Sequence, residues 1–178
     1  MSDDIPLLRL QDAWRECERH VYHLFHAMSS IQTFWPLTGE TYATLSDEQV
    51  QDVDQFILRY TKLQDTMGSR LFPAILQYLT EQFEDRPMLD KLNRLEKLGF
   101  IDSVEKWQTV RSIRNKFAHD YPDDPDKNAA QLNLAFESVS DLHAMLSIVS
   151  TKLKSEYPVL ELGKSLPVES SGFGADCD

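Results

Sequence analysis

Cysteine, glycine, positive charge and long apolar runs are all scarce in this chain. Only two cysteines, Cys17 and Cys177, occur in 178 residues, and they lie near opposite ends. We therefore expect no disulfide framework and a reducing compartment. No apolar run reaches the length that spans a bilayer. The acidic first residues also lack the basic start of a secretory signal, so the sequence predicts a cytoplasmic protein without a membrane partner.

Negative charge dominates the composition but is unevenly distributed. Asp and Glu total 29 against 18 Lys and Arg, a formal net charge of -11. This balance excludes a protein that coats nucleic acid through its whole surface. The segment from Arg86 to His119 is the exception, with eight basic and four acidic residues. Such a basic segment can hold a phosphate, or it can be a solvated helix surface with ordinary charge pairing.

Apolar residues recur at three- and four-residue spacing along most of the chain, which is typical of helices. The six glycines and the lack of β-branched alternation favour the same fold class. We predict an all-α, up-and-down bundle of about five helices in one domain over residues 1–158. A disordered tail is predicted over 159–178. The expected helices cover about residues 6–34, 47–83, 86–98, 103–119 and 126–156.

Local signals set the boundaries of these helices. Pro36 disfavours helical backbone at the preceding residue and ends the first helix. Ser46 and Gln49 form the pattern of a capping box at the start of the second. Pro73 lies inside that second helix, where it predicts a kink or a break. Gly99 is a helix stop.

The residues most informative about chemistry follow one another between positions 111 and 122. Asn115 and His119 are four residues apart and share one face of a helix. Arg114 lies roughly 100° around the axis from Asn115. Tyr121 precedes a proline and is expected to lie beyond the helix. A cation, an amide, an imidazole and a phenol therefore gather where the helix ends.

This set of groups is suited to phosphodiester chemistry without a metal. An imidazole, with a reference pKa of about 6.5, can give or take a proton near neutral pH. A guanidinium can grip a phosphate and stabilise the charge that builds in the transition state. The alternative is a structural helix end, at which His119 meets the negative end of the helix dipole and Tyr121 packs.

The same residues resemble a known family. Arg114, His119 and Tyr121 match the R-x4-H-x-Y signature of HepT-like toxins in the HEPN superfamily. The segment Arg94–Ser103, followed by Trp107, is similar to the region that precedes this motif in the family. The detailed resemblance covers residues 86–124, and the helical pattern extends it loosely over about 5–156.

The resemblance implies a HEPN-like homodimer in which two copies of the motif form one cleft. Active members of the family are metal-independent endoribonucleases that need no cofactor and cut RNA through attack of the ribose 2′-hydroxyl. By this analogy His119 transfers protons and Arg114 binds and polarises the phosphate. Asn115 would support the motif, and Arg111 and Lys116 would add auxiliary contacts to phosphate or RNA.

The resemblance also implies a partner and a form of control. HepT-like toxins of type VII-like toxin–antitoxin systems are neutralised by a minimal nucleotidyltransferase. This antitoxin adds AMP to the motif tyrosine, here Tyr121. The added phosphate would occupy the RNA site and repel the substrate. The alternative is a HEPN module that binds a nucleotide and supports a nucleotidyltransferase without cutting RNA.

Three histidines in the first predicted helix, His20, His23 and His26, are the other set considered for chemistry. Two of them could face one side of the helix and bind a metal. Successive three-residue steps drift around the helix, however, and no set of cysteines or carboxylates accompanies them. The sequence therefore predicts no metal site.

Overall fold

The computed structural model describes residues 4–117 and 123–158, together with Leu160, Leu162 and Leu166. This part of the chain is helical and contains no strand, which confirms the predicted all-α class. None of the helices in these ranges combines the length and the apolar character needed to cross a membrane.

The first helix, α1 (Asp4–Ile31), continues directly into one 3-10 turn, η1 (Gln32–Phe34). Together α1 and η1 cover nearly the predicted range of about 6–34. Trp35 then adopts an extended backbone, with φ −100° and ψ 147°. This conformation is the one expected for a residue that precedes proline, so Pro36 ends the helix as predicted.

The second predicted helix begins where the capping box placed it. In α3 (Asp47–Thr66), the hydroxyl of Ser46 accepts from the backbone N–H of Gln49 at 3.2 Å. The Gln49 side chain in turn accepts from the backbone N–H of Ser46 at 2.9 Å. A short helix that the sequence did not predict, α2 (Gly39–Ala43), precedes it.

The second predicted helix, over about 47–83, is interrupted near Pro73, where a kink or a break was predicted, and it ends earlier, at Tyr78. After α3 the chain forms a π-helical segment, η2 (Met67–Leu71), and then α4 (Phe72–Tyr78). Pro73 lies in the first turn of α4. It has no N–H to donate to a carbonyl one turn earlier, so regular α-helical bonding cannot run through this point. The wider π turn is the form that the predicted break takes.

Two shorter segments follow on one side of the molecule. The helix α5 (Met88–Lys97) ends at Gly99, whose φ of +75° is easily adopted only by glycine. The helix α6 (Val104–Lys116) begins at Ser103, and the Ser103 hydroxyl accepts from the backbone N–H of Lys106. Ser103 is therefore the N-cap of α6, as expected at the start of the predicted range 103–119.

The last helix, α7 (Pro125–Glu156), matches its predicted range and is capped by Asp124, which accepts from the backbone N–H of Lys127. Leu160 and Leu166, which lie in the segment predicted as a tail, are both buried. The other residues of that segment, apart from Leu162, lie outside the described part of the chain.

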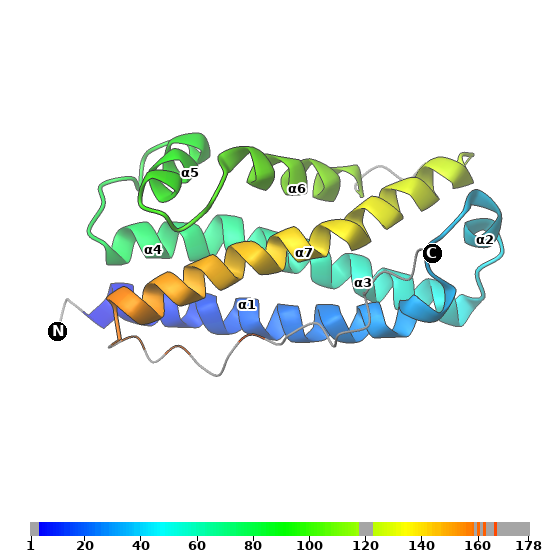
Figure 1. Cartoon of the computed structure of the whole chain (residues 1–178), viewed down its shortest axis with the longest axis horizontal. Helices are drawn as coiled ribbons and strands as arrows, with labels where there is room; N and C mark the ends of the chain where they lie inside the picture. Colours follow the sequence, from blue (N-terminus) through cyan, green and yellow to red (C-terminus); the bar gives the residue numbers. More distant parts are fainter. Residues whose placement is uncertain (1–3, 118–122, 159, 161, 163–165, 167–178) are drawn as a thin grey trace, which may run out of the picture.

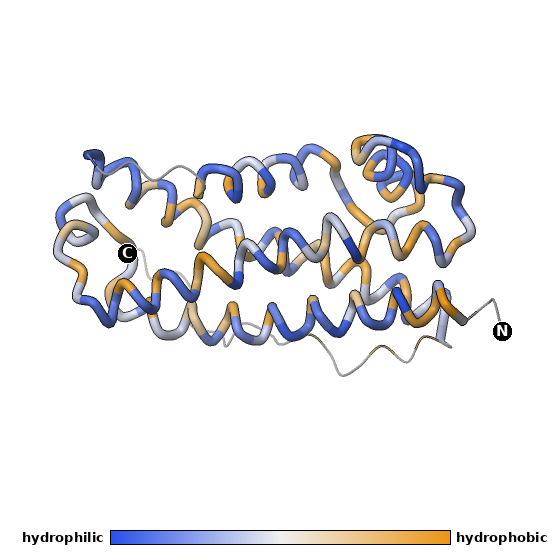
Figure 2. The backbone as a smooth tube through the Cα atoms, turned by 180° about the vertical axis from the view of Figure 1, so that it is seen from behind, coloured by the Kyte–Doolittle hydropathy of each residue, from blue (hydrophilic) through white to orange (hydrophobic). Residues whose placement is uncertain are grey.

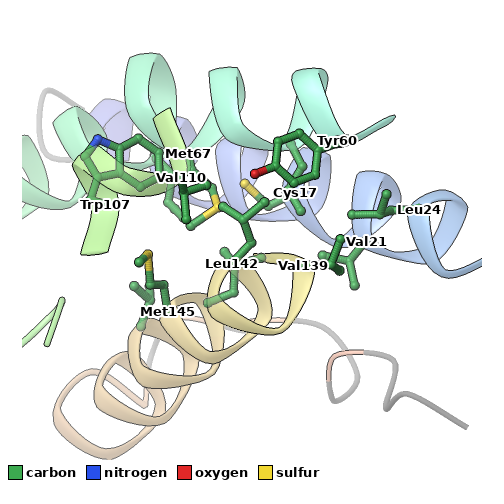
Figure 3. Close-up of a cluster of buried hydrophobic side chains, with 14 of the residues drawn as sticks. Cys17, Val21, Leu24, Tyr60, Met67, Trp107, Val110, Val139, Leu142 and Met145 are labelled. Carbon is green, nitrogen blue, oxygen red and sulfur yellow. The ribbon is translucent and has the colours of Figure 1, made fainter. Parts of the chain in front are cut away.

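The long helices run alternately up and down the molecule (Figure 1). α3 and α4 return alongside α1, α6 runs back above them, and α7 crosses the bundle diagonally. Hydrophobic and hydrophilic residues alternate along each long helix, as expected for helices with one buried face (Figure 2). The core gathers side chains from α1, α3, η2, α6 and α7, including Cys17, Tyr60, Met67, Trp107 and Leu142 (Figure 3).

Candidate functional site

The candidate site lies on the C-terminal half of α6, on the side that faces α3 and η2. Trp107, Val110 and Ile113 recur every three residues and are buried, which fixes the rotation of α6 on the bundle. The indole of Trp107 packs edge-on against the Phe72 ring, with the ring centroids 4.8 Å apart. Residues 111 and 114, each one position further along, are thereby held at the margin between core and solvent.

Arg114 pairs with an acidic residue from a distant part of the sequence. Its Nη2 donates to Oδ2 of Asp65, on the last turn of α3, at 2.8 Å. Its Nη1 lies 3.4 Å from the side-chain oxygen of Asn115, while its Nε is enclosed and has no hydrogen-bond partner. The Arg114 side chain remains 32% exposed, so part of the guanidinium faces solvent.

The other described motif residues surround this ion pair. Arg111, Asn115 and Lys116 are exposed. Arg111 lies one turn before Arg114 and Asn115, so the three share a side of α6. Neither Arg111 nor Lys116 forms an ion pair within residues 4–117 and 123–158. The structure thus brings Arg111, Arg114 and Asn115 together.

The predicted proton-transfer residue, His119, and the predicted modification site, Tyr121, lie outside the described residues. Their neighbour Phe117 packs edge-on against the ring of Tyr60, with the ring centroids 5.5 Å apart. The Tyr60 hydroxyl lies 2.8 Å from the hydroxyl of Ser138 on α7, and burial raises the pKa of Tyr60 to about 12. The end of α6 is therefore fixed to both α3 and α7.

Folding pairs three of the eight cations of the basic segment with carboxylates. Arg94 donates two hydrogen bonds to Glu81, at 3.0 and 2.7 Å, and this pairing holds the pKa of Glu81 below its usual value. Lys106 pairs with Asp102 at 2.6 Å. Glu81 lies outside the basic segment, as does the partner of Arg114. Ordinary charge pairing therefore accounts for part of this segment, while five cations form no ion pair with described residues: Arg86, Lys91, Lys97, Arg111 and Lys116.

A cavity of about 420 Å³ opens beside the ion pair, between the end of α3, η2 and α6. Seven residues line it: Gln64, Asp65, Gly68, Ser69, Met88, Trp107 and Arg111. A second cavity, of about 530 Å³, lies between α1, α4 and the segment before α5, and Arg9, Arg70 and Lys91 contribute its cations. The first cavity therefore adjoins the predicted site, and the second contains no residue of the predicted motif.

The histidines of α1 are placed apart from this site. His20 is buried, its Nε2 lies 3.6 Å from a carboxylate oxygen of Glu16, and its Nδ1 has no partner. Burial, together with the nearby cations Arg59 and Lys62, holds the pKa of His20 below its usual value. Within residues 4–117 and 123–158, no three side chains of His, Cys, Asp or Glu gather closely enough to hold a metal ion.

Asp65 and Gln64 are the residues of this site that sequence reasoning missed. Asp65 is 49 positions from Arg114, so no local spacing connects the two. Only Gly68, which lies within η2, and Pro73, which follows it in α4, signalled an irregular stretch at this point of the chain. Comparisons of the chain with protein-family models, with curated proteins and with solved structures gave no significant match.

Proposed function

We propose that the protein is a HepT-like toxin of the HEPN type, a homodimeric, metal-independent endoribonuclease. The observation that carries the proposal is the position of Arg114. Its guanidinium is held at the surface by Asp65 through one nitrogen, and part of it still faces solvent. A guanidinium in this state can accept a phosphate on its remaining N–H groups. Arg111, on the same side of α6, would contact a neighbouring phosphate.

The proposed reaction is a transesterification within the RNA chain. His119 takes the proton of a ribose 2′-hydroxyl, and the 2′-oxygen attacks the adjacent phosphorus. The bond from phosphorus to the 5′-oxygen breaks, and that oxygen leaves with a proton returned by an imidazolium. Arg114 stabilises the negative charge that builds on the phosphoryl oxygens. In the dimer, two copies of the α6 end would supply these groups to one cleft.

Control by AMP addition is part of the same proposal. A nucleotidyltransferase antitoxin would direct the phenol oxygen of Tyr121 to the α-phosphorus of ATP, with pyrophosphate as the leaving group. The added phosphate would then compete with RNA for Arg114. Intact-mass measurement of the protein, expressed with and without the transferase, would detect this modification as AMP-sized steps that map to Tyr121.

The test of catalysis is cleavage of end-labelled RNA in the presence of EDTA. We expect Arg114→Ala and His119→Ala to slow cleavage by about 10²-fold or more, the scale at which such groups contribute. Arg15→Ala is the matched control, because Arg15 is an exposed arginine on α1 that pairs with Asp12. Undiminished cleavage by folded His119→Ala protein would remove the catalytic assignment.

A nucleotide-binding module without cleavage is the second candidate. The exposed part of the Arg114 guanidinium would serve it equally, because it can hold a nucleotide phosphate as well as an RNA phosphate. On this hypothesis Arg114 and His119 would hold a nucleotide phosphate, and no RNA would be cut. Saturable binding of a nucleotide by protein that leaves RNA intact in the same buffer would select this function.

A further inference from the structure

The cavity beside Arg114 is shaped by the irregular segment η2. At Gly68 a Cβ atom would lie 3.0 Å from Cζ2 of Trp107, so a larger residue would press on the indole that lines this wall. Met88, at the start of α5, adds a second apolar surface. The volume of about 420 Å³ falls within the range of about 300–1,000 Å³ that small-molecule sites occupy.

Gln64 is a nearly enclosed polar residue that lines this cavity. The residue is only 4% exposed, yet its amide makes no hydrogen bond within the described part of the chain. Its neighbours differ, because the Thr66 hydroxyl donates to Glu16 and the Ser69 hydroxyl donates to the backbone oxygen of Asp65. An amide that lines a cavity and has no partner among the described residues can bond a ligand with its own donor and acceptor.

Two charged residues that line the cavity connect it with the proposed phosphate-binding residue, Arg114. Asp65 lines the cavity and also holds Arg114, so the cavity and the proposed phosphate-binding cation share one side chain. Arg111, on α6, also lines the cavity and forms no ion pair within the described residues. A group that enters the cavity can thus contact Arg111 and the carboxylate that holds Arg114.

We propose that this cavity receives a nucleobase of the RNA substrate, next to the phosphate held by Arg114, and that Gln64 determines which base is accepted. An amide offers a donor and an acceptor side by side, and adenine is the base with which Gln forms such a pair of hydrogen bonds. Unstacked bases of single-stranded RNA are recognised through their edges in this way. The inference rests on the proposed function, because it requires Arg114 to bind the RNA backbone.

Binding of uncleavable oligonucleotides separates base selection from cleavage. Short 2′-O-methyl homopolymers of A, C and U lack the attacking hydroxyl, and their affinity is measured by fluorescence anisotropy at fixed salt. We expect wild-type protein to bind the A oligomer about tenfold or more tightly than the U oligomer, the scale of one paired amide contact. In Gln64→Met this preference should fall below about threefold, with U binding unchanged.

Two variants serve as controls. Gln55→Met makes the same replacement at an exposed position of α3 and should retain the preference. Arg111→Gln should weaken binding to all oligomers by the same factor, because phosphate contacts are insensitive to the base. Melting temperatures of all variants establish that each is folded.

The outcomes distinguish the two proposals. An equal affinity for all homopolymers, no measurable binding, or a preference that survives Gln64→Met would overturn the base pocket even if RNA is cut in EDTA. A preference for A that Gln64→Met removes would support the pocket even if wild-type protein cuts nothing, and only the nuclease would then fail.

Discussion

The ion pair between Asp65 and Arg114 can be tested by removing the negative charge of Asp65. Asp65→Asn keeps the size of the side chain and an oxygen that can accept from Arg114, but removes the negative charge. Both side chains are partly exposed, 48% for Asp65 and 32% for Arg114. Exposed pairs contribute up to about 1 kcal/mol to stability, so the variant should melt no more than about 2–4 °C below wild type.

The effect on RNA binding should have the opposite sign. A phosphate held by the exposed part of the guanidinium would lie about 5 Å from the Asp65 carboxylate. At that distance two negative charges repel by about 0.8 kcal/mol in a water-like dielectric, and by more where water is excluded. Removing the carboxylate charge should therefore strengthen binding about fourfold or more.

The assay is the anisotropy titration of 2′-O-methyl oligomers described above. Asp54→Asn removes the same charge from an exposed position of the same helix, and it reports the effect of net charge alone. An affinity of Asp65→Asn equal to that of Asp54→Asn, or weaker than wild type, would refute the reasoning. A weaker affinity would mean that Asp65 acts by holding Arg114 in place.

Three further replacements test contacts of the fold by urea unfolding. Gly39→Ala should destabilise the fold by about 1–3 kcal/mol, because the new Cβ would clash with the side chain of Asp126 and lie 3.0 Å from its backbone nitrogen. A variant as stable as wild type would contradict this contact. Tyr60→Phe should lower the free energy of unfolding by about 1 kcal/mol, because the hydrogen bond to Ser138 is lost. A double-mutant cycle with Ser138→Ala measures the coupling between the two hydroxyls, and a coupling of zero would contradict the prediction. His20 has a folded pKa below its unfolded value, so the unfolded state gains its proton first as the pH falls. Wild type should therefore lose stability below about pH 6.5, and His20→Gln should lose less between pH 7 and 5; identical pH dependences would contradict this assignment.

Much of the helical layout was predictable because its signals are local. Ser46 and Gln49 cap α3 through contacts three residues apart, and Gly99 ends α5 because its φ is positive. The apolar periodicity likewise placed α1 and α7 within a few residues of their ends. Pro73 indicated that α3 would not continue unchanged, although the form of the break was not predictable. Each of these features depends on side chains within one or two turns of one another.

The sequence by itself determined the helices and placed Arg111, Arg114 and Asn115 on one side of α6. Only the tertiary structure paired Arg114 with Asp65 and placed the amide of Gln64 at a cavity, where no described residue bonds it. It also neutralised part of a basic segment with acids from outside that segment. These contacts join residues tens of positions apart, and they depend on how the buried faces of α3 and α6 rotate against each other. Helical spacing specifies which residues share a face, but packing of the core decides which two faces meet.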